Sequence, residues 1–75
     1  MVGTVSNVVT AKGYGFISTE DGEEYFFHRQ DTLGTSWDDL NFDFSNSGAG
    51  KVKVQFLPDK TPKGPRARNV TLTED

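Results

Sequence analysis

The chain has 75 residues, of which 33% are hydrophobic and none is cysteine. This length suits one small domain, residues 1–75, with a thin core; the composition excludes disulfides, thiolate metal sites and a membrane-spanning run. A net charge of −3 hides an uneven distribution, because residues 20–43 hold eight carboxylates and one cation, whereas residues 51–68 hold six cations and one carboxylate. We expect an acidic side and a basic side, the latter able to attract a phosphate backbone.

Alternating and β-branched residues predict strands, which we place at residues 2–9, 12–19, 24–29, 51–57 and 66–73. The strongest local signal is Asp21-Gly22, a dipeptide typical of the turn in a β-hairpin. Pro58 is expected to end the fourth strand, and residues 59–65 are expected to form a loop. The core would be filled by inward residues of these strands: Ile17, Tyr25, Phe27, Val52, Val54, Phe56, Val70 and Leu72.

The segment between the third and fourth strands, about residues 30–50, shows no clear periodicity. We find no window with the apolar spacing of a helix, so we predict a long loop whose end, residues 45–50, is a flexible tip. The segment is nevertheless too apolar for complete disorder. Trp37 within it either stacks on a ligand or caps one end of the barrel, and these alternatives have even weight.

Two aromatic runs dominate the middle of the chain, Lys12-Gly-Tyr-Gly-Phe-Ile17 and Tyr25-Phe-Phe-His28. Strand periodicity places Tyr14 and Phe16 on one face of their strand, and Phe26 and His28 on one face of the next. Alternating aromatics are usually core residues. The intervening glycines reverse that expectation here, because glycines facing water would weaken the strand, whereas glycines facing inward let a tightly curved backbone approach closely.

An outward aromatic surface suits nucleobases, which all have a π-face. The first run also fits the ribonucleoprotein pattern of RNA-binding sheets, apart from Ile17 and Thr19. An RNA-recognition motif would need two amphipathic helices and the shorter aromatic motif first, and the sequence indicates neither. These observations favour an all-β fold, a small five-stranded antiparallel barrel.

With these strands and aromatic runs, the chain resembles the cold-shock domain, a compact OB-fold nucleic-acid binder. The resemblance covers almost the whole sequence. Matching features occur in the family's order, at residues 3–5, 12–17, 25–28, 63–65 and 69–70, with Trp37 where the family often carries a loop aromatic. It implies a protein that binds single-stranded RNA or DNA and acts as an RNA chaperone or regulator of gene expression. A cytoplasmic location is the default expectation, since no membrane-spanning run is present. Met1 to Thr4 also look unlike a signal peptide.

The chain departs from the family at three aromatic positions. Asn7 and Val8 stand where members usually have Trp and Phe, and Arg29 follows the motif histidine where Phe is common. The guanidinium of Arg29 can both stack and bind phosphate. We therefore expect weaker or differently tuned binding and not its loss.

Other chemistry finds little support. Residues 39–43 open like a calcium loop, but Phe44 and Gly50 stand where the glycine and the bidentate glutamate belong, so no metal is expected. Glu24 and His28 share a strand face as an acid–base pair would. There is no second histidine and no other catalytic constellation, so neither enzymatic activity nor a cofactor is expected.

The sequence thus predicts a monomeric binder of single-stranded nucleic acid with low sequence selectivity. The proposed binding residues are Lys12, Tyr14, Phe16, Phe26, His28, Arg29, Trp37, Lys63 and Arg66, with Lys60 and Arg68 as weaker candidates. The alternative is an OB module whose aromatic surface docks a protein partner and binds nucleic acid weakly or not at all.

Overall fold

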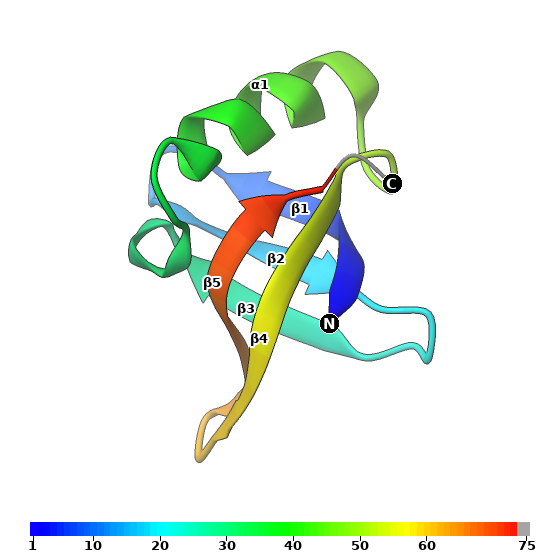
Figure 1. Cartoon of the computed structure of the whole chain (residues 1–75), viewed down its shortest axis with the longest axis vertical. Helices are drawn as coiled ribbons and strands as arrows, with labels where there is room; N and C mark the ends of the chain where they lie inside the picture. The colour runs from blue at the N-terminus through cyan, green and yellow to red at the C-terminus, as the bar shows by residue number, and fades with distance from the viewer. Residues whose placement is uncertain (74–75) are drawn as a thin grey trace.

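The structure, a computed structural model, describes residues 1–73 and shows five strands closed into a barrel (Figure 1). The strands are β1 (Val2–Val9), β2 (Tyr14–Ser18), β3 (Glu24–His28), β4 (Lys53–Thr61) and β5 (Gly64–Leu72). Two helices separate β3 from β4: the 3₁₀ helix η1 (Arg29–Asp31) and the α-helix α1 (Ser36–Ser47). Neighbouring strands follow the order β1-β2-β3-β5-β4, and the predicted barrel is confirmed.

The strand pairs are antiparallel with one exception. A parallel contact between Phe26 of β3 and Arg66 of β5 closes the barrel, which corrects the expectation of a wholly antiparallel sheet. Strand β2 starts two residues later than predicted because Gly13, at φ 74°, belongs to the turn after β1. Its N–H donates to the carbonyl of Val9 at 2.9 Å. This turn leaves Lys12 outside the sheet, at the entrance to β2.

Alternate residues of the strands fill the barrel. Ile17 and Phe27 are fully buried, and Tyr25 is 2% exposed. Further inward side chains complete the core: Val5, Leu40, Val52, Val54, Phe56, Ala67 and Val70, with Leu72 packed at its edge. The predicted core residues are therefore confirmed.

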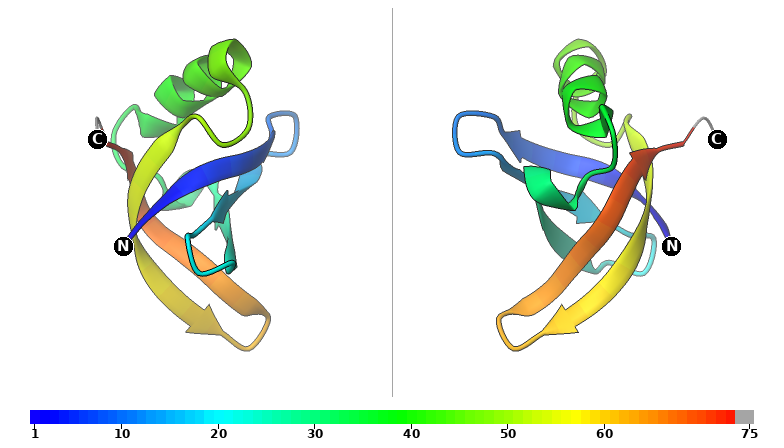
Figure 2. Two further views of the ribbon diagram at one scale, coloured as in Figure 1. Left: turned by 90° about the vertical axis from the view of Figure 1, so that its right-hand side faces the viewer. Right: turned by 60° about the vertical axis from the view of Figure 1, so that its left-hand side comes forward.

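The fourth strand is longer than predicted. It passes through Pro58, which lies opposite Ala67, and ends only at Thr61. Pairing between β1 and β4 stops at Gln55, so Pro58 has a neighbouring strand on one side only, where its missing N–H costs little. The predicted loop 59–65 is consequently wrong: these residues form a hairpin that projects from the end of the barrel opposite α1 (Figure 2).

Helix α1 was not predicted, and it replaces most of the expected loop. Its inward residues, Trp37, Leu40 and Phe44, are spaced by three and four and pack on the core. Phe42 points outward and is 70% exposed, which disguised this spacing in the sequence. The segment predicted as a flexible tip forms the last turn of α1 and its cap, where the N–H of Gly48 donates to the carbonyl of Phe44 at 2.8 Å. The helix lies across one end of the barrel (Figures 1 and 2).

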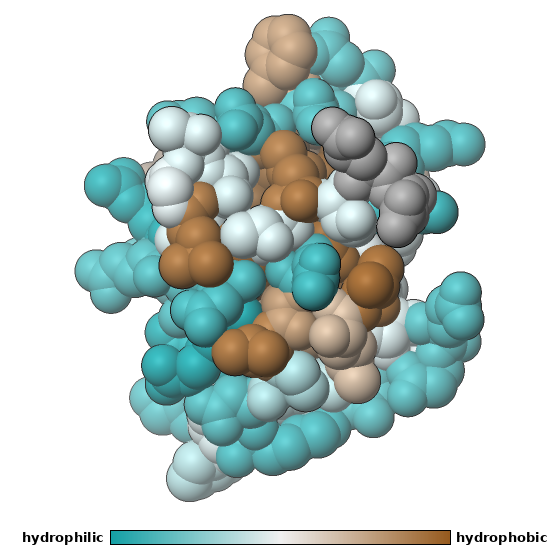
Figure 3. Space-filling view, viewed as in Figure 1, coloured by the Kyte–Doolittle hydropathy of each residue, from teal (hydrophilic) through white to brown (hydrophobic). Residues whose placement is uncertain are grey.

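The outer side formed by β4 and β5 carries apolar side chains scattered among polar ones (Figure 3). Leu57 of β4 and Val2 of the adjoining β1 are each more than half exposed, and each is paired with a polar residue of the next strand, Arg68 and Gln55 respectively. This side is an ordinary protein surface. Among residues 1–73, no helix has the length and hydrophobicity needed to cross a membrane.

Candidate nucleic-acid interface

Three aromatic rings meet on the outer face of β2 and β3. The ring centroids lie 5.4 Å apart for Tyr14 and Phe26, 5.8 Å for Phe16 and Phe26, and 5.9 Å for Tyr14 and Phe16. All three side chains are partly exposed. We call Tyr14, Phe16 and Phe26 the aromatic platform; its rings are tilted or edge-to-face, so their edges and parts of their faces are open to an incoming planar group.

The platform faces outward because glycine occupies the inner position of β2 between Tyr14 and Phe16. An ideal Cβ on Gly15 would lie 2.8 Å from the Phe27 ring and 2.8 Å from the carbonyl oxygen of Asn7. A side chain at position 15 therefore has no room, and the sequence-based orientation is confirmed. Phe27 fills the space that Gly15 leaves, so the same contact that completes the core keeps Phe16 and Phe26 on the outside.

Sheet register arranges the outer residues in two rows, since paired residues project to the same side. One row runs from Val9 through Tyr14 to His28, and the other runs from Asn7 through Phe16 and Phe26 to Arg66. Asn7 is exposed beside Phe16, whereas Val8 packs partly against the core. An aromatic ring at position 7, where this chain has asparagine, would therefore extend the second row.

His28 stands at the end of the platform, opposite Tyr14. Its Nδ1 accepts a hydrogen bond of 3.3 Å from the backbone N–H of Gln30 and so caps η1. The proton of the neutral ring then lies on Nε2, the nitrogen left free to donate to a ligand. His28 is half-buried, as expected for a residue that is both structural and accessible.

Two cations flank this same end of the platform. Arg29 follows β3, and its backbone N–H donates to the carbonyl of Gly13 at 2.9 Å. Its aliphatic stem lies over Gly13, where an added Cβ would be 3.2 Å from Arg29 Cδ. Lys12 precedes Gly13, and both cations are exposed. The turn after β1 thus brings together two predicted binding residues 17 positions apart.

The other side of the platform borders a groove. It separates Phe16 and Phe26 from the β4–β5 hairpin and has a volume of about 500 Å³. The hairpin side of the groove is lined by Thr61, Lys63, Gly64, Pro65 and Arg66. Lys63 is exposed at the tip of the hairpin. The structure therefore places the predicted cations Lys63 and Arg66 beside the rings, as the sequence-based proposal requires.

The remaining cations differ in whether a carboxylate already holds them. Arg66 pairs with Asp31 and Arg68 with Asp59, at 3.0 and 2.7 Å, and Lys60 pairs with Glu23. The hydrogen bond that the Lys60 ammonium donates to the Glu23 carboxylate raises the pKa of Lys60. Within residues 1–73, Lys12, Arg29 and Lys63 form no ion pair. Of the cations around the platform, these three are the ones most available to phosphate.

Trp37 does not belong to the aromatic platform. It lies on α1, and its ring centroid is 6.1 Å from that of Phe27, an inward residue. Its partial burial against the core corresponds to the capping alternative. As the single tryptophan of the chain, Trp37 becomes a probe of barrel folding.

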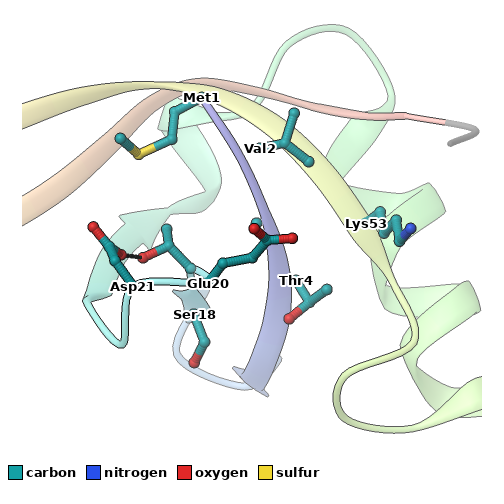
Figure 4. A pocket seen from close by; sticks show the side chains of 9 residues that line it. Met1, Val2, Thr4, Ser18, Glu20, Asp21 and Lys53 are labelled. Atoms are coloured by element: carbon teal, nitrogen blue, oxygen red, sulfur yellow. Dashed lines mark hydrogen bonds between the residues drawn. The ribbon is translucent and has the colours of Figure 1, made fainter.

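A second open pocket lies at the N-terminal end of β1 (Figure 4). Glu20, Asp21 and Lys53 surround it, and no platform residue lines it. The Thr19 hydroxyl donates to Asp21 and lowers the pKa of that carboxyl. Among the described residues, no group of three or more histidine or carboxylate side chains is placed to hold a metal ion. The pocket therefore adds nothing to the platform's chemistry.

Sequence reasoning missed Asp31, Thr61 and Pro65. Asp31 is buried and pairs with Arg66, 35 residues away, and no local pattern indicates such a partner. Thr61 and Pro65 lie on the hairpin that was predicted as a loop. Recognising that Lys60-Thr61 and Gly64-Pro65 flank a two-residue turn would have found them.

Comparison with known proteins agrees with the geometry. The family model described as the "'Cold-shock' DNA-binding domain" matches residues 1–73. A curated relative, "Probable cold shock protein A" of Mycobacterium tuberculosis, is 36% identical over 69 residues, which cover 91% of this chain and 91% of the relative. The match extends over the platform, the hairpin and the strand-one positions discussed above.

Proposed function

The chain belongs to the cold-shock domain family, and from this premise we propose that its aromatic platform binds single-stranded RNA or DNA with low sequence selectivity. Members of this family are non-enzymatic nucleic-acid binders, so the chain is a binding module and not an enzyme. The observation that carries the proposal is the set of three mutually contacting rings on the outside of a barrel whose inside is filled by other aromatics.

Stacking is the interaction that this surface offers. A base placed over Phe16 or Phe26 replaces contact with water by contact with a ring, and every base has a face suited to this. Stacking requires the base to leave its own helix. Binding therefore competes with base pairing, and structured strands melt when their unpaired segments are captured.

Charge supports a path for the backbone along the platform. Lys12 and Arg29 stand at one end, and Lys63 stands across the groove, so phosphates can follow the edges of the rings. Apart from Glu24 on the outer face of β3, many exposed carboxylates lie elsewhere, on the β2–β3 turn and on the outer side of α1: Glu20, Asp21, Asp38, Asp39 and Asp43. We expect modest affinity, because the chain is acidic overall. We expect strong salt dependence, because the phosphate contacts are made by exposed cations whose charge salt screens.

The corresponding cellular role is that of an RNA chaperone or regulator of gene expression, acting in the cytoplasm as a monomer. This role follows from the family and from the melting mechanism. The platform consists of three rings, which suits transient contact with many sequences and not tight recognition of one.

A titration of labelled oligonucleotides tests the proposal. Matched pyrimidine-rich ribo- and deoxyribo-oligomers are titrated with the full chain at low and at high salt, and anisotropy is recorded. We expect saturable binding to both, weakened by salt yet not abolished, because stacking persists when charges are screened. The absence of binding to either oligomer at low salt would contradict the proposal and favour a platform that docks a protein.

A further inference from the structure

Arg66 differs from the other cations of the groove in having a fixed partner. Its Nε donates to Asp31 Oδ2 at 3.0 Å and its Nη2 donates to Oδ1 at 3.3 Å. The Asp31 side chain is 7% exposed and the Arg66 side chain 35%. A two-point contact of this kind fixes the plane of the guanidinium as well as its position.

Asp31 is also tied to the platform strand. Its Oδ2 accepts a 2.9 Å hydrogen bond from the backbone N–H of His28, the last residue of β3. The pair therefore links β3 to β5 next to the single contact, Phe26 with Arg66, through which these strands are paired. Within residues 1–73, Asp31 is the one buried charged side chain.

The result is a planar group held in line with the rings. Arg66 occupies the row that contains Phe16 and Phe26, and it lines the groove with both of them. Its charge is balanced by Asp31, so attraction for phosphate is weakened. Its face is not consumed by the ion pair, which uses the edge of the guanidinium, and a guanidinium face stacks on nucleobases.

We propose that the Asp31–Arg66 pair fixes Arg66 as a further stacking plane beside Phe26, so that Arg66 contributes base stacking and not phosphate binding. This inference rests on the proposed function. Asp31 is then a positioning residue, since it acts on the ligand only through Arg66 and His28. Lys63, on the same side of the groove, has no such partner among residues 1–73 and acts as a point charge on phosphate.

Replacement of arginine by lysine separates the two roles. Arg66→Lys keeps a positive charge opposite the buried carboxylate and removes the planar group. Binding of a labelled oligothymidylate to the full chain is measured over a range of salt concentrations, and Trp37 fluorescence melts verify folding. We expect Arg66→Lys to bind about fivefold or more weakly, with the wild-type log–log salt slope unchanged.

Two further variants sharpen the test. Lys63→Gln, the matched control on the same hairpin, should flatten the salt slope by about 0.7, the value for one phosphate contact on a single strand. Asp31→Asn keeps an acceptor for the His28 N–H and releases the charge of Arg66, so its slope should steepen by up to about 0.7. If Arg66→Lys fails to fold, Asp31→Asn still tests the proposed role of the ion pair.

Wild-type affinity in Arg66→Lys, or a slope unchanged in Asp31→Asn, would overturn the inference and leave the proposed function standing. Failure of the wild-type chain to bind the oligomer would instead overturn the proposed function, and the role of Arg66 with it. The variants thus test the role of Arg66 and the wild-type chain tests the proposed function, in the same experiment.

Discussion

Phe26 and Phe27 are neighbours in the chain and opposites in the fold. Phe27 is fully buried against Trp37 and the inner side of Gly15, whereas Phe26 is partly exposed among the rings of the platform. Both faces of β3 are thus aromatic, and the period of two along the strand assigns one face to folding and the other to binding. The two side chains can therefore be altered independently, and their burial predicts which substitution unfolds the domain.

The largest effect is expected from Phe27→Ala. Removal of a fully buried ring leaves a cavity and costs about 3–5 kcal/mol, comparable with the whole stability of so small a domain. The variant should lose its cooperative thermal transition, measured by circular dichroism and by Trp37 fluorescence. A cooperative melt close to that of the wild type would show that Phe27 is not a core residue.

Gly15→Ala tests the same inner face by adding atoms. The new methyl group would lie 2.8 Å from both the Phe27 ring and the Asn7 carbonyl oxygen, and overpacking of this kind costs about 1–3 kcal/mol. A denaturant titration should show a lower midpoint. Ser18→Ala, on the outer face of the same strand, serves as the control and should change stability little. Equal stability of the two variants would contradict the inward placement of Gly15.

Phe26→Ala tests the outer face. The barrel interior does not change, so the variant should melt within a few degrees of the wild type. Loss of one stacking partner should weaken oligonucleotide binding by about 1–3 kcal/mol. Anisotropy titrations of the folded variant measure this. Unaltered affinity, or a collapse of the melt like that of Phe27→Ala, would mean that the two faces of β3 have been assigned the wrong way round.

Asn7→Trp sharpens the comparison by adding to the binding face. Asn7 is exposed next to Phe16, at the position where the resemblance to the family implies a tryptophan. The added ring should strengthen binding by about 1 kcal/mol, roughly fivefold, and leave the melt nearly unchanged. Gln55→Trp places the same ring on β4, away from the platform, and should have no such effect. Equal gains in the two variants would indicate nonspecific adhesion.

The sequence predicted the two faces well because period-two alternation is local, and because glycine at an inner position has an evident structural reason. The predictions failed where the local structure depends on contacts with residues far away in the sequence. Helix α1 was missed because the exposed Phe42 breaks an otherwise helical spacing, and the barrel, not the helix sequence, provides the partner for Leu40. The sequence also wrongly placed the end of the fourth strand at Pro58. Proline is tolerated there because β4 has only one neighbouring strand at that point, which the strand order shows and the local sequence does not.

For the candidate site, too, local patterns were predictive and long-range contacts were missed. The positions of Tyr14, Phe16 and Phe26 on the outer face were predicted from strand spacing and from the intervening glycines, and they are confirmed. Arg66 lies beside the rings, but its pairing with Asp31 depends on how β5 meets the end of β3. Trp37 had two open interpretations, and contact with Phe27 places it against the core.

The central claim is that bases stack on the aromatic platform, which requires a strand with exposed base faces. The most direct measurement compares a pyrimidine-rich single strand with its own duplex at one salt concentration, using the wild type and the folded Phe26→Ala variant. The account predicts that the wild type binds the single strand much more tightly than the duplex and that Phe26→Ala loses most of this preference. Equal affinity of the wild type for both forms would leave only a nonspecific contact with charge and would contradict the account.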